Sequence, residues 1–323
     1  MLSSSKNRFS RLTTFIYISC ALAFFFLTLH SLRRTYLVDP SSALGQFRAQ
    51  KPPQTIPEKI WYKLGPKGMT EEVATWMQTC IEKNPSYEAH FLTDDPGDAY
   101  VRETFAHSPD IVEIYLGLSV PILKADLLRY LLLYADGGVW FDLDVSCEGT
   151  PIANWVPELY RQKAGLVVGW EFDVGWGKDG EFQHQFASWT IMARPHSPHM
   201  MVVIQDILQG VRDKMAEHQL GSIPDLELSM VGDVVDFTGP RRFTRGVMKS
   251  LERHQWALNG AVDHDGLYQI LEPRTVGDVL VLPGYSFALS MNKYEEISEK
   301  GEPGPPLVTH HYAGTWKNDR GGE

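Results

Sequence analysis

Cysteine and positive charge are both scarce in this chain. Three Cys in 323 residues are too few for a disulfide-rich scaffold or a cysteine-rich zinc module. Lys and Arg total 30 against 40 Asp and Glu, which gives a formal net charge of −10 at pH 7. Proteins that bind the phosphate backbone of nucleic acids usually carry a basic excess, so we expect no nucleic-acid partner.

The rest of the composition is that of a globular protein. Hydrophobic residues make up 43% of the chain and charged residues 22%. These fractions exclude disorder, collagen and coiled coil as descriptions of the whole chain. The sequence has no internal repeat, and its length suits one large domain or two small ones.

An apolar run near the N-terminus predicts a membrane anchor. Residues 13–32 (TTFIYISCALAFFFLTLHSL) hold no Asp, Glu, Lys or Arg, and about 20 apolar residues cross the hydrocarbon core as a helix. A cleaved signal peptide and a buried core helix are the alternatives, but the run lacks a small-x-small cleavage site. We expect a cytosolic tail at 1–12, a signal-anchor at 13–32, a stem at 33–55 and a luminal domain, since the leading basic cluster favours a cytosolic N-terminus.

Alternating strand and helix patterns over residues 56–317 predict one α/β domain, followed by a tail at 318–323. We expect strands at 59–64, 87–92, 139–142, 166–170, 188–192, 279–282 and 307–310. We expect helices at 70–84, 122–135 and 199–218, a further helix after Pro240, and a turn at 93–97.

The segment 123–144 (LKADLLRYLLLYADGGVWFDLD) carries the strongest chemical signal. Asp126 and Arg129 are three positions apart and share a face of an otherwise apolar helix. Buried charges are costly unless they are paired or bind a ligand. The two residues therefore form either a structural ion pair or a site for a polar ligand.

Two further carboxylates end the strand that follows. Asp142 and Asp144 are two positions apart, so their side chains can project to the same side. Open α/β sheets bind ligands at the carboxyl ends of their strands, and hard divalent cations combine a few carboxylates with phosphate oxygens. The pair predicts a site for a metal-bound diphosphate, although Asp-x-Asp alone occurs by chance in many chains.

Five stretches of the sequence together resemble glycosyltransferase family 32, whose members carry an Asp-x-Asp motif and use sugar nucleotides. They are Ile56-Pro57 with Lys59-Ile60-Trp61, residues 124–144, residues 186–195, Thr238-Gly239-Pro240 and residues 310–317 (HHYAGTWK). The last three are similar to the fungal branch that adds α-1,6-linked mannose. Residues 170–185 depart from that pattern.

The resemblance implies a GT-A fold, which is Rossmann-like, and a set of site residues. Asp142, Asp144 and His311 would bind Mn²⁺ or Mg²⁺, and Trp61 would lie against the nucleobase. The remaining contacts to ribose, phosphate or donor sugar would come from Asp126, Arg129, Asp142 and Thr238. Core packing would also explain Trp61, and a structural hydrogen bond would explain His311.

The activity implied is retaining transfer of mannose from GDP-mannose to a glycan, most specifically α-1,6 addition to the core N-glycan at the Golgi membrane. Complexes with other Golgi mannosyltransferases fit this expectation. The alternatives are an inositol phosphorylceramide mannosyltransferase, a catalytically silent sugar-binding protein and a nucleotide-sugar hydrolase.

Two features stay open at the level of sequence. Retention needs either a carboxylate nucleophile or a front-face route, and Glu171 is the candidate at the anomeric centre or acceptor site. A solvated acidic loop is the alternative interpretation of Glu171. Cys80 and Cys147 could pair in an oxidising lumen, but the sequence does not show it.

Overall fold

The computed structural model describes residues 55–65, 68–175, 184–256, 265–314, 317–318 and 320–322. The predicted cytosolic tail, the signal-anchor at 13–32 and the stem up to residue 54 lie outside these ranges. Among the residues described, every helix is too short or too polar to cross a membrane.

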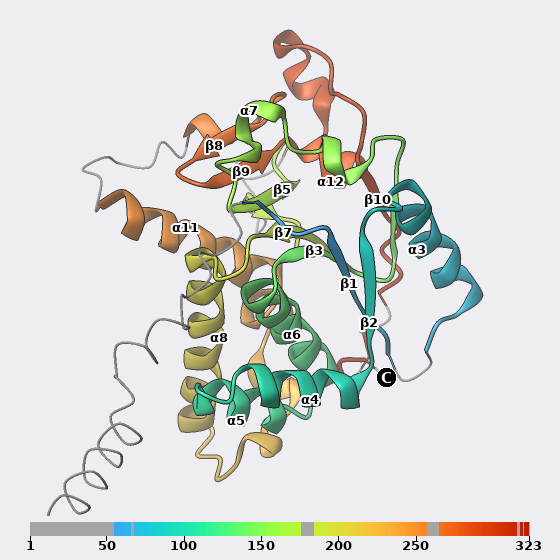
Figure 1. Ribbon diagram of the computed structural model, residues 1–323. Helices are drawn as coiled ribbons and strands as arrows, with labels where there is room; N and C mark the ends of the chain where they lie inside the picture. Colours follow the sequence, from blue (N-terminus) through green and yellow to red (C-terminus); the bar gives the residue numbers. More distant parts are fainter. Residues whose placement is uncertain are drawn as a thin grey trace, which may run out of the picture. The chain divides into compact units, whose positions relative to one another are not determined.

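A mixed sheet organises the domain, and it confirms the predicted α/β class (Figure 1). Its strand order is β2-β1-β3-β7-β5-β9-β8, and β6 pairs with β5. β1 pairs in parallel with β2 and β3, whereas β7 is antiparallel to β3 and β5. The bounds are β1 (Lys59–Lys63), β2 (Glu88–Leu92), β3 (Gly138–Phe141), β5 (Leu166–Phe172), β6 (Gln185–Phe186), β7 (Thr190–Ala193), β8 (Arg274–Val276) and β9 (Val279–Leu282).

Helices and a small second sheet cover the two faces of this sheet. One face packs on α4, α5, α6, α8 and α11, and the other on α3, α12 and the two-stranded sheet of β4 and β10 (Figure 1). The helix bounds are α3 (Glu71–Lys83), α4 (Asp94–Thr104), α5 (Pro109–Gly117), α6 (Pro121–Ala135), α7 (Glu158–Arg161), α8 (Pro198–Glu217), α9 (Leu228–Val231), α10 (Val234–Phe237), α11 (Pro240–Trp256) and α12 (Gly284–Ala288). The small sheet consists of β4 (Val145–Cys147) and β10 (Val308–His310).

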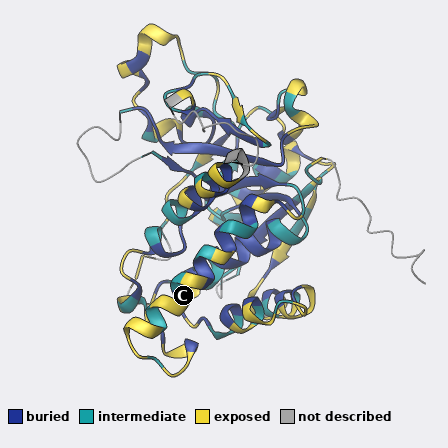
Figure 2. Cartoon of the chain, turned by 90° about the vertical axis from the view of Figure 1, so that its left-hand side faces the viewer, coloured by how far each residue is buried: buried dark blue, intermediate teal, exposed yellow. Residues whose placement is uncertain are grey.

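Helix α6 explains how the segment 123–144 folds. It begins at Pro121, whose fixed φ suits a first helical turn. Most of its residues are buried, consistent with its apolar circumference, and Figure 2 colours the chain by burial. The chain then turns into β3 through Gly137 and Gly138, which have φ of 68° and 103°. A Cβ on Gly138 would lie 2.8 Å from the carbonyl oxygen of Lys59, so only glycine fits between β3 and β1.

Most predicted elements appear within two residues of their expected bounds, but the turn predicted at 93–97 is wrong. Residues 94–104 form α4 instead. Asp94 and Asp95 stabilise the first helical turn through the helix dipole, and Pro96 is tolerated there because the N–H it lacks has no helical partner. Gly97 and Val101 are buried, so tertiary packing fixes the helix.

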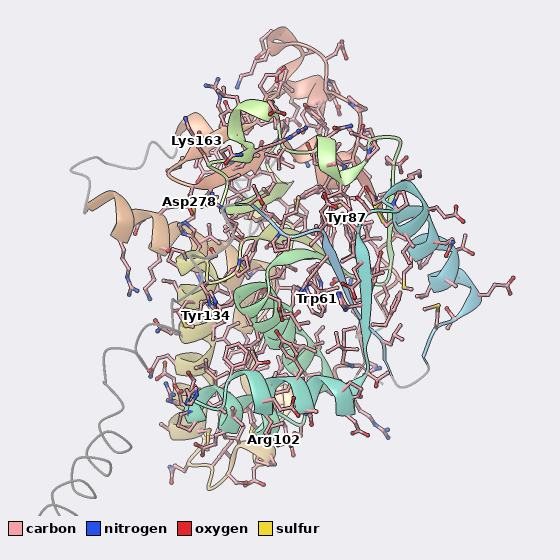
Figure 3. All side chains as sticks on the ribbon, in the orientation of Figure 1. Trp61, Tyr87, Arg102, Tyr134, Lys163 and Asp278 are labelled. Carbon is pink, nitrogen blue, oxygen red and sulfur yellow. A yellow bond between two sulfur atoms is a disulfide. The ribbon has the colours of Figure 1, made fainter. Side chains whose placement is uncertain are left out.

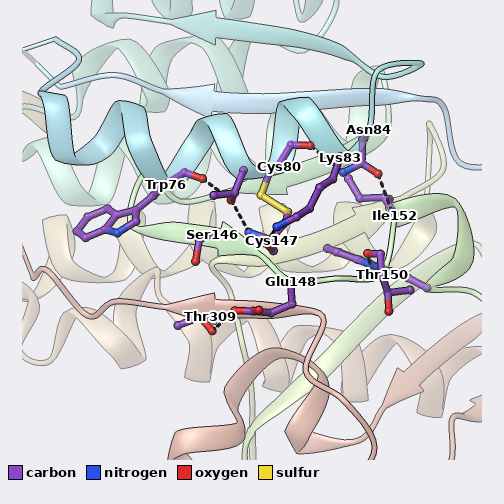
Figure 4. Close-up of a disulfide and its surroundings, with 12 residues drawn as sticks. Trp76, Cys80, Lys83, Asn84, Ser146, Cys147, Glu148, Thr150, Ile152 and Thr309 are labelled. Carbon is purple, nitrogen blue, oxygen red and sulfur yellow. Dashed lines mark hydrogen bonds between the residues drawn. A yellow bond between two sulfur atoms is a disulfide. The ribbon is translucent and has the colours of Figure 1, made fainter.

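A disulfide joins Cys80 of α3 to Cys147 of β4, which answers the pairing that the sequence left open (Figure 4). β4 begins directly after Asp144, and its other neighbour is β10, where Val308 lies opposite Cys147. The disulfide thus fastens the segment after the two carboxylates to the helix that covers the sheet.

Candidate functional site

Asp142 and Asp144 lie where β3 ends, at the carboxyl edge of the parallel strands β1 and β3. The backbone N–H of Asp142 donates to the carbonyl of Trp189, 2.9 Å away, so the chain leaves the sheet beside β7. This is the edge at which open α/β sheets bind ligands.

Arg129 of α6 connects the helix to this edge. Its Nη2 lies 3.0 Å from Oδ1 of Asp142 and 3.1 Å from Oδ1 of Asp126, and the side chains of Arg129 and Asp126 are both about 95% buried. Thr238 donates from Oγ1 to Asp126 at 2.7 Å. Burial raises the pKa of Asp126 to about 6, although the charge of Arg129 opposes it. The structure thus brings together four of the predicted residues.

Arg129 also has spare donors. Its Nε and Nη1 atoms are buried and have no hydrogen-bond partner among the described residues. Asp142, by contrast, accepts a second hydrogen bond from Trp140 Nε1 at 2.6 Å. Unsatisfied N–H groups of a buried guanidinium suit an anionic or polyhydroxyl ligand, because leaving them unpaired is costly.

The C-terminal segment wraps around Asp144. His310 Nε2 lies 3.2 Å from Oδ1, the backbone N–H of Ala313 donates to Oδ2 at 2.9 Å, and that of His311 donates to the carbonyl oxygen at 2.8 Å. Burial alone would raise the pKa of Asp144, but the hydrogen bonds from His310 and Ala313 outweigh it and lower that pKa. We call residues 310–313 the Asp144 clamp.

The clamp brings His310, rather than His311, to the carboxylates. The ring of His311 stacks on Trp76 of α3 at 4.3 Å, and its Nε2 lies 2.9 Å from Ser146 Oγ. The metal-binding role of His311 stays a prediction. Sequence reasoning missed His310, and the signal available was that consecutive strand residues face opposite sides.

Trp61 lies apart from this site. It is 5% exposed, stacks on His90 of β2 at 4.5 Å and donates from Nε1 to the carbonyl of Gly137 at 2.8 Å (Figure 3). Gly137 precedes β3, whereas Asp142 follows it, so the indole N–H points to the opposite end of that strand. The structure therefore packs Trp61 in the core, and its contact with the nucleobase stays a prediction.

Glu171 belongs to β5 and is buried rather than part of a solvated loop. Its side chain accepts a 2.6 Å hydrogen bond from Gln185 Nε2. Burial raises the pKa of Glu171 to about 8, against that hydrogen bond and the charges of Arg241 and Lys317. At neutral pH the group is therefore mostly protonated, which makes it a poor nucleophile in this state.

The donor set fits a hard divalent cation that completes its coordination from a substrate. No group of three His, Cys, Asp or Glu poised for a metal occurs in the part of the chain that the structure describes. Asp142 and Asp144 nevertheless supply two carboxylates at one strand end. Burial raises the pKa of Asp142, and the nearby charge of Asp144 raises it further. Mg²⁺-type sites commonly combine one or two carboxylates with substrate phosphates.

Comparison with known proteins points to the same residues. The family described as "Glycosyltransferase sugar-binding region containing DXD motif" matches residues 70–161, which include α6, β3 and both carboxylates. The "Initiation-specific alpha-1,6-mannosyltransferase" of Candida albicans is 29% identical over 88% of this chain and 78% of that protein. The protein of the same name in Schizosaccharomyces pombe is 31% identical over 82% of this chain and 64% of its own length.

A second group of relatives matches a shorter region. The "Mannosyl phosphorylinositol ceramide synthase CSH1" of Saccharomyces cerevisiae is 28% identical over 34% of this chain and 29% of that protein.

Proposed function

We propose that this chain is a member of the glycosyltransferase family whose sugar-binding region contains the DXD motif, and that it is a metal-dependent mannosyltransferase using GDP-mannose. The observation that carries the proposal is the arrangement at the end of β3. Asp142 and Asp144 lie together there, held by Arg129 on one side and by the Asp144 clamp on the other. We assign the domain to the GT-A class on the same basis.

Asp142 and Asp144 would hold Mn²⁺ or Mg²⁺. The cation supplies Lewis-acid stabilisation of the departing nucleoside diphosphate. Arg129, whose Nη2 contacts Asp142, has two further N–H groups that lack a partner among the described residues, and we propose that they bind phosphate oxygens or sugar hydroxyls. Asp126 and Thr238 hold Arg129 in place through the buried ion pair and hydrogen bond.

The acceptor we propose is a glycan, with α-1,6 addition to the core N-glycan as the specific reaction. The relatives named for that activity match over more than four fifths of this chain, whereas the ceramide enzyme matches over about a third. We propose retention of the anomeric configuration. Retention takes either a carboxylate nucleophile, for which Glu171 is the candidate, or a front-face route.

We place the protein in the Golgi membrane as a single-pass type II protein with a luminal domain. The apolar run at 13–32 supports an anchor, and the Cys80–Cys147 disulfide supports an oxidising compartment. A high-mannose N-glycan and other Golgi mannosyltransferases are the partners that this location allows.

The rate of mannose transfer by the Asp144→Ala variant tests the proposal. With GDP-mannose, Mn²⁺ and a high-mannose N-glycan, the variant should lose about 10³-fold or more in rate, because charge stabilisation in the transition state is lost. The control is Asp95→Ala, which removes an exposed carboxylate on α4. Both variants should still unfold cooperatively on heating, which shows that they are folded. Full transfer by Asp144→Ala would refute the metal assignment.

A further inference from the structure

A cavity of about 180 Å³ lies beside the Asp144 clamp, between β10 and the end of α12. Its walls include Leu289, Ser290, Thr309, His310 and Tyr312. Pockets for drug-sized ligands usually measure about 300 to 1,000 Å³, so this space suits a single sugar ring. The cavity touches the site through His310, which lines it and also contacts Asp144.

The lining has the chemistry that a sugar ring requires. Tyr312 is 38% exposed and offers an aromatic surface, and Leu289 adds an exposed apolar one. Ser290 and Thr309 are the hydroxyl-bearing lining residues. The hydroxyl of Thr309 donates to Glu148 (Figure 4). Ligand pockets of this kind combine apolar and aromatic walls with a few polar groups that fix orientation.

His310 supplies an unsatisfied polar atom at this boundary. Its Nε2 contacts Asp144, while its Nδ1 is buried and has no hydrogen-bond partner within the described chain. Buried polar atoms are normally paired, and this residue lines the cavity, so a ligand there could supply the partner. A hydroxyl of a bound sugar would provide it.

Tyr312 connects the cavity with the carboxylates. Its ring packs against that of His310 with centroids 4.0 Å apart, and its hydroxyl lies within reach of the charges of Glu171 and Asp144. Its φ of 51° lies in the left-handed region, which non-glycine residues adopt at a cost. This turn brings the next residue, Ala313, to Asp144.

The position of the cavity separates it from the donor side of the site. Arg129 and Thr238, which face Asp142 and Asp126, belong to elements on the α6 face of the large sheet. The cavity belongs to the opposite face, where α12 and β10 pack. Asp144 connects the two regions, because it contacts His310 of the cavity wall and follows Asp142, the partner of Arg129, by two residues.

We propose that this cavity is the subsite for the accepting sugar, and that it takes one mannose ring of the acceptor glycan with Tyr312 as its platform. The inference rests on the proposed function, because it assumes that a mannose-containing glycan is the acceptor. It adds a substrate-specificity role for α12 and β10.

The test uses a substitution at an exposed position that fills the cavity, made in the full-length protein. Ser290→Phe places a large side chain on the cavity wall, and Ser298→Phe makes the same change at an exposed position outside it. Ser290→Phe should raise the acceptor KM, or lower acceptor kcat/KM, by about tenfold or more. Its KM for GDP-mannose and its GDP release without acceptor should stay within about twofold of the parent. Ser298→Phe should resemble the parent throughout.

A second variant and a binding measurement complete the test. Tyr312→Phe keeps the ring and should retain the acceptor KM, whereas Tyr312→Ala should raise it. Calorimetric titration with mannotriose should show binding to the parent and loss of binding by Ser290→Phe. An unchanged acceptor KM and unchanged mannotriose binding in Ser290→Phe would overturn the proposal.

The two proposals fail differently. If the parent transfers mannose and Ser290→Phe behaves like Ser298→Phe, the subsite is wrong and the function stands. If the parent transfers no mannose but Ser290→Phe loses mannotriose binding, the subsite stands and the proposed reaction is wrong. If the parent neither transfers mannose nor binds mannotriose, both are wrong.

Discussion

The imidazole Nε2 of His310 lies 3.2 Å from the Oδ1 of Asp144, although the two residues are 166 positions apart in the chain. The contact depends on the pairing of β10 with β4, in which His310 lies opposite Val145, the residue after Asp144. The C-terminal segment is therefore part of the site built around the DXD carboxylates, and its removal would leave Asp144 without three of its hydrogen bonds.

Replacing each of the two neighbouring histidines should separate their roles. His310→Ala removes a direct partner of Asp144 and should weaken Mn²⁺ binding in the presence of GDP by about 10- to 100-fold. His311→Ala removes a stacking contact with Trp76 and should change the affinity far less. Electron paramagnetic resonance of free Mn²⁺ gives both values. A larger loss in His311→Ala would instead support His311 as a metal ligand.

The buried hydrogen bond from Thr238 to Asp126 should contribute to stability. Thr238→Val keeps the shape of the side chain but removes the donor, so the buried carboxyl loses a partner at a cost of about 1–3 kcal/mol. Thr238→Ser keeps the hydroxyl and serves as the control. Urea unfolding measures both variants. A Val variant as stable as the parent would show that the hydrogen bond is unimportant.

The disulfide between Cys80 and Cys147 should stabilise the domain and the site. It closes a loop with a sequence separation of 67, and the double variant Cys80→Ala/Cys147→Ala should lose about 2–4 kcal/mol of unfolding free energy. Because β4 carries Cys147 and pairs with β10, transfer activity should fall as well. A reducing agent should destabilise the parent and leave the double variant unchanged; equal sensitivity in both would contradict the prediction.

Glu171 should make stability depend on pH. Its pKa is about 8 in the folded state against an ordinary value of 4.5, so the folded protein retains a proton that the unfolded chain releases between these values. The contribution of this group to the free energy of unfolding is therefore fully present below pH 4.5 and is lost as the pH rises towards 8. Glu171→Gln mimics the protonated form. The difference in unfolding free energy between this variant and the parent should therefore grow by at least about 1 kcal/mol in favour of the variant from pH 5 to pH 8. Urea unfolding measures this difference. If it is the same at pH 5 and at pH 8, Glu171 has an ordinary pKa.

Local patterns were sufficient to predict the elements that carry Arg129 and Asp142. The apolar circumference of α6, the Gly137-Gly138 turn and the hydrophobic strand β3 each have a local physical cause, and all three appear near their predicted bounds. Helix α4 was missed because the residues at 93–97 are common in turns, and the burial of Gly97 and Val101 that fixes the helix depends on tertiary packing.

Side-chain direction was harder to predict than backbone structure. Whether His310 or His311 faces Asp144 depends on the register of β10 against β4, which connects residues far apart in the chain. Trp61 likewise lies on a correctly predicted strand, but its direction depends on contacts with Gly137 and His90.

The central claim is mannose transfer that depends on a metal, and one measurement tests it directly. The full-length protein is incubated with GDP-mannose, Mn²⁺ and a high-mannose N-glycan, with and without a chelator, and the mass of the glycan is followed. We predict a gain of one hexose that the chelator abolishes and that excess Mn²⁺ restores. No gain in mass by a folded protein that also fails to bind GDP-mannose would contradict the claim.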